Sequence, residues 1–308
     1  MNDTDRSLKV RRVTKTAYAK INLSLDVLGR RKDGYHLIKM IMQTIDLSDT
    51  LVFETEDRET ESMEITLRTD NPLIPSGEDN LICRAIRAMA EEYKVRRDIT
   101  VTLDKRIPVA AGIAGGSTDA AAAMRAFRDL FVPDVTNADL RRIALPLGAD
   151  IPYCIEGGTR LSEGIGEALT VLPDAPQCAL VIAKPAAGVS TAEIYHAYDA
   201  LTDVCHPDID AQIRAIRDGD LPGMAGQCIN VLEEVTGAMY PQIGRMESWF
   251  MENGALASRM SGSGPTVFAI YNAPGPAERA VAKCIKDPAF AGCEVYLSRF
   301  VYSERASE

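Results

Sequence analysis

A glycine-rich segment that runs directly into an alanine-rich helical pattern constrains this chain more than any other stretch. It reads IPVAAGIAGGSTDAAAAMRAFRDL over residues 107–130. Apolar side chains recur at the spacing of a helix with one buried face, at Ala120, Ala123, Met124, Phe127 and Leu130. A glycine loop that leads into a helix exposes unpaired N–H groups at the positive end of the helix dipole, where phosphate binds well. The segment therefore predicts a phosphate-binding loop.

Two common nucleotide motifs are missing from this segment. No Gly-Lys-Ser or Gly-Lys-Thr follows the glycines, so it is not a Walker A loop. The dinucleotide fingerprint G-x-G-x-x-G is absent as well. Close packing of a small-residue helix against a sheet would explain the same residues without a ligand, and the segment alone favours neither reading. A nucleotide bound here requires a different loop architecture.

Composition excludes several classes of protein. The chain has 308 residues, enough for about two domains, and a formal net charge of −10, which disfavours nucleic-acid and membrane-surface binding. The seven cysteines contain no C-x-x-C pair, so we expect neither a disulfide framework nor a zinc cluster. The first residues lack the apolar segment of a secretory signal, and no apolar run is long enough to span a membrane. These features predict a cytoplasmic protein.

Residue patterns along the chain predict a mixture of helices and strands. Alternation over 19–25 predicts a strand with Lys20 and Asn22 opposite its apolar face; that second face is either solvated or lines a cleft. Other strands are expected over 37–53 (with a turn near Ser48 and Asp49), 64–67, 99–103, 157–172, 178–183, 257–260, 266–271 and 294–301. Other helices are expected over 80–93, 136–147, 191–201, 208–217, 222–235, 240–252 and 276–287.

A proline marks the end of the helix expected over 136–147. Pro152 cannot continue a helix and favours an extended Ile151, so Asp150 should stand at a sharp junction. Such a carboxylate either faces a cleft or simply forms a turn. A second change in composition, at Pro173-Asp174-Ala175-Pro176, predicts a domain boundary.

Three separated pieces together resemble the motifs of the GHMP kinases, the family of galactokinase, homoserine kinase and mevalonate kinase. They are AYAKINL (17–23), the loop over 108–120 and SGSGPTVF (261–268). The resemblance implies an α+β fold in two lobes. An N-terminal lobe over 1–173 would be like the second domain of ribosomal protein S5, and a C-terminal lobe over 174–308 would be ferredoxin-like.

The resemblance also implies a phosphoryl donor and its site. ATP, with Mg²⁺, would lie on the glycine loop, and Ser117 or Thr118 would place a hydroxyl near the metal. The implied ATP-binding residues are Asn80, Lys105, Pro108, Ala110, Ala111, Gly112, Ile113, Ala114, Gly115, Gly116, Ser117 and Thr118. Asp119 follows the hydroxyls directly, and we expect its carboxylate to point away from the triphosphate or to reach the metal.

Four pieces make the resemblance closer: AYAKINLSLDVLGRRKDGYH (17–36), DNLICRA (79–85), GIAGGSTDAA (112–121) and LGADIPYC (147–154). This closer resemblance implies a cytidine diphosphate alcohol as the acceptor. The implied acceptor-binding residues are Asn22, Tyr35, His36, Thr191, Tyr195, Ser261 and Gly262. Lys20 and Asp150 match the catalytic pair of the family. A carboxylate can take the proton of an acceptor hydroxyl, and a lysine can keep that carboxylate ionised and stabilise negative charge on oxygen.

Three alternatives stay open at this point. The chain could be a GHMP kinase for a sugar, an amino acid or a mevalonate-type alcohol. It could be a nucleotide-binding or regulatory protein without catalysis, which the presence of both Lys20 and Asp150 disfavours. It could be an S5-like nucleic-acid-binding module, which the net charge disfavours. A monomer and a homodimer are equally compatible with the sequence.

Overall fold

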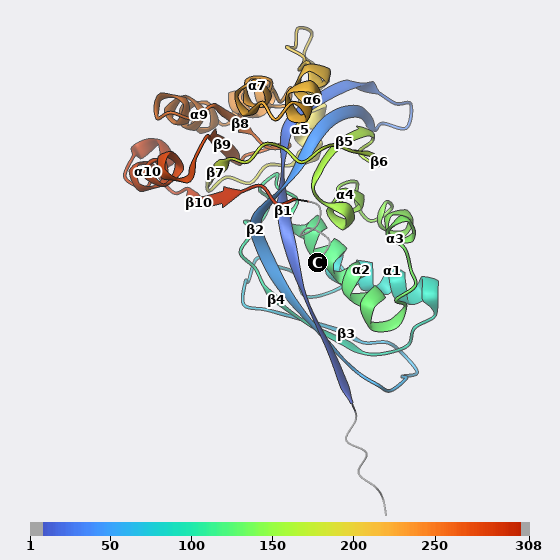
Figure 1. Ribbon diagram of the computed structural model, residues 1–308. Helices are drawn as coiled ribbons and strands as arrows, with labels where there is room; N and C mark the ends of the chain where they lie inside the picture. Colours follow the sequence, from blue (N-terminus) through green and yellow to red (C-terminus); the bar gives the residue numbers. More distant parts are fainter. Residues whose placement is uncertain (1–8, 303–308) are drawn as a thin grey trace, which may run out of the picture. The chain divides into compact units, whose positions relative to one another are not determined.

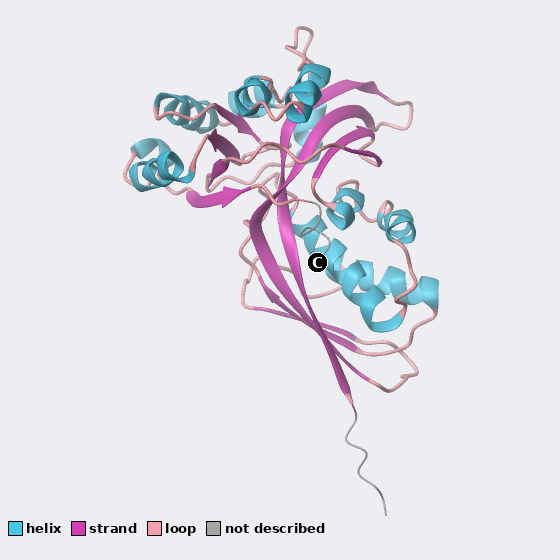
Figure 2. Ribbon diagram, viewed as in Figure 1, coloured by secondary structure: helices cyan, strands magenta, loops and turns pink. Residues whose placement is uncertain are grey.

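The computed structural model describes residues 9–302, which form two compact units. The first unit consists of the described part of Met1–Ala17 together with Ser48–Arg106 and Gly116–Ile155. The second consists of Tyr18–Leu47, Ile107–Gly115 and the described part of Glu156–Glu308. Both contain helices and strands (Figures 1 and 2). The lobe boundary between residues 173 and 174 stays a prediction.

Two long strands each contribute to both units. They are β1 (Val10–Arg30) and β2 (His36–Glu56), which pair with each other. In the first unit, β4 (Ile99–Asp104) pairs antiparallel with Thr50–Glu54 of β2 and parallel with β3 (Ile65–Thr69). The helices that lie wholly or almost wholly in this unit are α1 (Leu81–Tyr93), α2 (Gly115–Phe131), α3 (Asn137–Ala144) and α4 (Ile151–Glu156).

Capping and small side chains explain the helices of the first unit. The Asn80 side chain accepts a hydrogen bond of 2.8 Å from the Ile82 N–H and so caps α1. Thr136 and Asp139 form a capping box at the start of α3. The alanines over 120–123 of α2 are fully buried. Their small side chains let the helix backbone lie close to its neighbours. The expected helices over 80–93 and in the segment 107–130 are therefore confirmed.

The second unit contains a separate antiparallel sheet in the order β10-β7-β9-β8. These strands are β7 (Ala179–Lys184), β8 (Ala257–Met260), β9 (Val267–Tyr271) and β10 (Glu294–Arg299). In the same unit, β5 (Thr159–Gly164) pairs with Ile38–Gln43 of β2 and with β6 (Ala168–Val171). The helices are α5 (Thr191–Tyr198), α6 (Ile209–Arg217), α7 (Leu221–Gly226), α8 (Glu233–Met239), α9 (Gln242–Glu252) and α10 (Pro274–Cys284).

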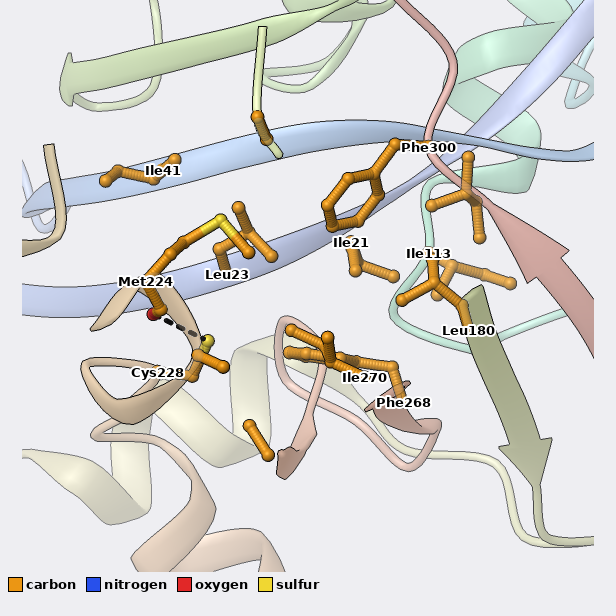
Figure 3. Packing of buried hydrophobic residues seen from close by; sticks show 14 of the residues in the cluster. Ile21, Leu23, Ile41, Ile113, Leu180, Met224, Cys228, Phe268, Ile270 and Phe300 are labelled. Atoms are coloured by element: carbon orange, nitrogen blue, oxygen red, sulfur yellow. Dashed lines mark hydrogen bonds between the residues drawn. The ribbon is translucent and has the colours of Figure 1, made fainter. Parts of the chain in front are cut away.

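One hydrophobic cluster joins β1, the glycine loop and this second sheet. Its members within the second unit include Ile21, Ile113, Leu180 and Phe268, all at most 1% exposed. Figure 3 shows these side chains converging from their separate segments. The glycine loop is therefore held by a packed core on the side of Ile113.

Several local expectations were wrong. No turn interrupts β2 at Ser48 and Asp49, because the Asp49 carboxylate accepts hydrogen bonds inside the strand region rather than forming a turn. The segment expected as one helix over 222–235 is two short helices, α7 and α8. The first strand extends from Val10 to Arg30, well beyond the alternation over 19–25 that predicted it.

Pro152 starts a helix and does not end one. The preceding helix, α3, already ends at Ala144, and α4 begins at Ile151 with Pro152 in its first turn. A proline is tolerated there because the first N–H groups of a helix have no intrahelical partner. The expected extended conformation of Ile151 is therefore wrong, and Asp150 directly precedes α4. Within residues 9–302, no helix combines the length and the apolarity that a membrane span needs.

Candidate functional site

The glycine loop has an unusual backbone. Residues Ala110, Gly112 and Ala114 have positive φ values of 51°, 73° and 60°. Such values disfavour side chains with a Cβ, so two alanines in this region indicate a loop whose shape is imposed by its surroundings. The helix that follows, α2, has 17 residues and no acidic side chain in its first turn. A loop of this form leading to a helix N-terminus suits an anion.

The loop is fixed against the segment 261–264 within the second unit. A Cβ added at Gly112 would lie 2.5 Å from the Ser261 carbonyl oxygen and 2.8 Å from that of Gly264. The Ser261 hydroxyl donates to the Gly112 carbonyl oxygen at 3.1 Å and accepts from the Asn22 N–H at 3.2 Å. The Lys20 N–H donates to the Ile113 carbonyl oxygen at 3.2 Å. The structure thus brings together β1, the loop and the SGSGP segment, which are far apart in the sequence.

Lys20 and Asn22 do not lie on a solvated face. They are 4% and 1% exposed, and the Lys20 Nζ donates to the Asn22 Oδ1 at 2.8 Å. A lysine is rarely enclosed to this degree, because burying its charge is costly unless polar groups compensate. The solvated-face alternative for this side of β1 is therefore wrong.

Three of the residues expected at the acceptor, His36, Thr191 and Tyr195, form a polar group in or against α5 in the second unit. The His36 Nε2 lies 2.6 Å from the Asp199 Oδ1, and the ring centroids of His36 and Tyr195 are 4.8 Å apart. Thr191, the first residue of α5, exchanges a hydrogen bond of 2.9 Å with Ser263. Tyr35 lies in the β1–β2 turn and is 60% exposed, so its ring is available for contact.

Asp199 was missed by the sequence reading. Besides His36 it binds the Arg30 Nη1 at 2.9 Å, and the hydrogen bond from His36 lowers the pKa of its carboxyl. Asp199 follows α5 directly, where the helix dipole disfavours a negative charge. A carboxylate at the C-terminal end of a predicted helix is the sequence signal that could have indicated a positively charged partner elsewhere in the chain.

In the first unit, Lys105 is enclosed between two carboxylates. Its Nζ lies 2.6 Å from the Asp49 Oδ2 and 2.6 Å from the Asp119 Oδ2, and all three side chains are at most 5% exposed. We expected the Asp119 carboxylate to point away from a triphosphate or to reach a metal. In the structure it faces Lys105. Asp49, which also accepts from the Arg106 N–H at 2.6 Å, was missed.

One cation cannot neutralise two ionised carboxylates in an interior. Burial is the main cause that raises the pKa of Asp119 to about 8, and the neighbouring Asp49 adds to it while Lys105 opposes it. When Asp119 carries a proton, the group formed by Lys105, Asp49 and Asp119 has no net charge.

The other residues expected at the ATP site in this unit differ in accessibility. Asn80 is occupied as the cap of α1 and also donates to the Pro75 carbonyl oxygen at 2.7 Å. Thr118 is buried, whereas Ser117 is half-buried and Gly116 is exposed. Ser117 is therefore the hydroxyl better placed to meet a ligand. No cluster of three or more metal-ligating side chains occurs among residues 9–302.

Asp150 is half-buried at the start of α4. Its carbonyl oxygen accepts a hydrogen bond of 3.0 Å from the Cys154 N–H, the first helical bond of that element. The short helix therefore holds the backbone from which the Asp150 carboxylate extends.

Comparisons with known proteins match both halves of the chain to one family. The model of the GHMP kinases N terminal domain matches residues 80–158, and that of the GHMP kinases C terminal domain matches residues 200–288. A 4-diphosphocytidyl-2-C-methyl-D-erythritol kinase of Lachnoclostridium phytofermentans is 43% identical over 94% of this chain and 97% of the relative.

Solved structures give the same result. A crystal structure of 4-(cytidine 5'-diphospho)-2C-methyl-D-erythritol kinase matches with a TM-score of 0.77 at 28% identity, covering 94% of this chain and 99% of the other. Homoserine kinase from Cytophaga hutchinsonii matches with a TM-score of 0.74 at 18% identity, covering 97% and 100%, and supports the fold alone. The expected two-lobed α+β fold is confirmed.

Replacing Gly112 by alanine should destabilise the protein by roughly 2 kcal/mol or more, because of the positive φ and the contact with two carbonyl oxygens. Chemical denaturation measures the effect. Gly77→Ala is the control, since no atom lies within 4 Å of its added Cβ, and its midpoint should hardly change. Equal midpoints for the two variants would contradict the tight anchoring of the loop.

Replacing Asp119 by asparagine should flatten the dependence of stability on pH. Because the folded-state pKa of Asp119 is raised, the folded protein binds more protons than the unfolded chain between about pH 4 and pH 8. The wild-type free energy of unfolding should therefore fall as the pH rises through this window, by at most ~1.4 kcal/mol per pH unit. Asp119→Asn should remove this pH dependence. Denaturation at several pH values measures it.

The exposed carboxylate Asp104, which pairs with Arg106, gives the matched control. Asp104→Asn should keep the wild-type slope. If Asp119→Asn kept the wild-type dependence of stability on pH, Lys105 would keep Asp119 ionised, and the raised pKa of Asp119 would be contradicted.

Proposed function

This chain belongs to the GHMP kinases, a family of small-molecule kinases, and we propose that it transfers the γ-phosphoryl group of ATP to the 2-hydroxyl of 4-diphosphocytidyl-2-C-methyl-D-erythritol. This reaction belongs to the non-mevalonate route to isoprenoid precursors. The single observation that carries the proposal is the 43% identity to a kinase named for this acceptor, over 94% of the chain. The 28% identical crystal structure of a kinase with this acceptor supports it.

The glycine loop and the start of α2 fit the phosphates of ATP. The positive φ values in the loop and the exposed Gly116 leave backbone N–H groups at a helix N-terminus without an acid in its first turn. Mg²⁺ commonly uses few protein ligands together with phosphate oxygens, and we propose the Ser117 hydroxyl as one of them. When bound, the ion supplies charge neutralisation at the phosphates.

The polar group near α5 fits the cytidine end of the acceptor. His36 carries a fixed ring, since Asp199 holds its Nε2 and Tyr195 lies against it. Tyr35 and Tyr195 supply flat faces on which a base can stack. Thr191, Asn22 and the backbone of Ser261 and Gly262 supply further polar groups in the same unit.

We assign the proton transfer to Asp150 and the stabilisation of charge to Lys20. The acceptor hydroxyl loses its proton to the Asp150 carboxylate as the phosphorus–oxygen bond to the acceptor forms and the bond to ADP breaks. Lys20 is a buried cation on a strand, and its proposed role is to stabilise the negative charge that develops on oxygen during the transfer. Both roles follow from the family pattern in the sequence, and each residue is held by backbone hydrogen bonds in its own unit.

The compartment and the assembly remain proposals. All seven cysteines are free, as is usual in a reducing compartment, and we propose the cytoplasm as the place of action. Small molecules are the proposed partners, with no nucleic acid and no membrane. A monomer and a homodimer both remain compatible with the proposed chemistry.

Purified protein should release ADP when it is supplied with ATP and 4-diphosphocytidyl-2-C-methyl-D-erythritol. A coupled ADP assay should show much slower turnover with homoserine, galactose or mevalonate, because none of them offers a base to the group around His36 and Tyr195. Turnover with one of these three and none with the cytidine acceptor would refute the acceptor assignment. No turnover with any of the four would favour a nucleotide-binding protein without catalysis.

Asp150→Asn should lower kcat by roughly 10²–10⁴ and leave the KM values of both substrates nearly unchanged, because the amide keeps the shape but cannot take the proton. Asp134→Asn, which changes an exposed carboxylate in the same unit, is the control and should keep full activity. A wild-type rate in Asp150→Asn would remove Asp150 from the role of base.

A further inference from the structure

Arg125 of α2 is enclosed within the first unit although its charge has no counter-ion there. The side chain is 2% exposed and is one of the largest buried side chains. Its Nη1 donates to the Cys154 carbonyl oxygen at 2.8 Å and its Nη2 to the Thr16 carbonyl oxygen at 3.4 Å, while its Nε has no hydrogen-bond partner. Among residues 9–302 no carboxylate forms a salt bridge with it.

An unpaired guanidinium is a costly way to fill a core. Burial lowers the pKa of Arg125 to about 10, which still leaves it charged near neutral pH. Replacement of buried charges by well-packed apolar residues is often neutral or stabilising. Packing alone therefore gives no reason for a cation at this place, and the hydrogen bonds that it makes are the feature to explain.

Those bonds lead to the backbone of Asp150. Cys154 accepts from Arg125 through its carbonyl oxygen and donates its own N–H to the Asp150 carbonyl oxygen at 3.0 Å. Both bonds lie in or beside α4, which has only six residues. A helix this short is not stable by itself, so its orientation depends on contacts with the rest of the unit. A cation near its last carbonyl groups also complements the helix dipole.

We propose that Arg125 is a positioning residue that fixes α4, and through it the carboxylate of Asp150, relative to α2. The inference rests on the proposed function, in which Asp150 is the base and the start of α2 holds the phosphates. The same helix then carries the phosphate-binding N–H groups at its first turn and, about three turns later, the side chain that holds the base in place. A displacement of the base by about 1 Å can cost roughly 10²-fold in rate, so a rigid link between the two is useful.

A double-mutant cycle tests this role. Steady-state kinetics and thermal stability would be measured for the wild type, Arg125→Met, Asp150→Asn and the double variant, at a temperature where all four are folded. Arg125→Met should lower kcat by roughly 10–100-fold and change either KM by less than about threefold. In the Asp150→Asn background the same substitution should change kcat by less than about twofold, because the residue through which it acts is already disabled.

Two further variants complete the design. Arg125→Lys keeps a cation that can donate to the Cys154 carbonyl oxygen, so it should recover part of the lost rate, and it replaces Arg125→Met in the cycle if the methionine variant does not fold. Arg128→Met, on the same helix, removes an arginine whose hydrogen-bond partners in the described part of the chain are Asp129 and Asn137, and it should keep the wild-type kcat.

The outcomes separate this inference from the proposed function. The inference alone would be overturned if Arg125→Met, or Arg125→Lys in its place, lowered kcat equally in both backgrounds. It would also be overturned if KM rose while kcat stayed unchanged. Either result would show a role in general stability. An Asp150→Asn variant with full activity would overturn both the inference and the assignment of the base. A loss of kcat that appears only when Asp150 is present would support both.

Discussion

The second unit depends on a strand whose two faces are both enclosed. In β1 the apolar residues Ala19, Ile21, Leu23 and Leu25 are at most 3% exposed, and the polar residues between them, Lys20, Asn22, Ser24 and Asp26, are at most 6% exposed. Buried polar groups need hydrogen-bond partners. Ser24 therefore donates to Gln212 of α6 at 2.5 Å, and Asp26 binds His206 at 2.6 Å. The partners of this polar row decide which helices and loops can lie beside the strand, and the glycine loop is one of them.

Two buried cations in the first unit illustrate different solutions to the same cost. Lys105 is neutralised by neighbouring carboxylates, and when Asp119 carries a proton the cluster has no net charge. Within residues 9–302, the hydrogen-bond partners of Arg125 are carbonyl oxygens, which solvate a guanidinium without neutralising it. The first arrangement joins β2, the residue that follows β4, and α2. The second joins β1, α2 and α4. Both use charge to define positions that apolar packing would leave less specific.

Sequence reasoning predicted what is encoded locally. The helices α1 and α2 follow from periodicity and from the cap at Asn80, and the loop and motif residues follow from their spacing and resemblance. Asp49 was read as a turn residue because its partner Lys105 is 56 positions away. The polar face of β1 could not be assigned, since alternation shows that a strand has two faces and not what covers each. Asp199 and Arg125 were missed for the same reason: their roles depend on partners that no local pattern marks.

The division into units also limits how this protein can be dissected. The chain passes between the two units at residues 17/18, 47/48, 106/107, 115/116 and 155/156. Each unit is therefore assembled from several separate stretches of one gene. A single proteolytic cut or a truncated reading frame cannot separate one unit from the other, and an expression fragment that begins at residue 1 and ends between residues 18 and 154 lacks segments of both. Halves that fold independently would instead require the joining of non-adjacent segments.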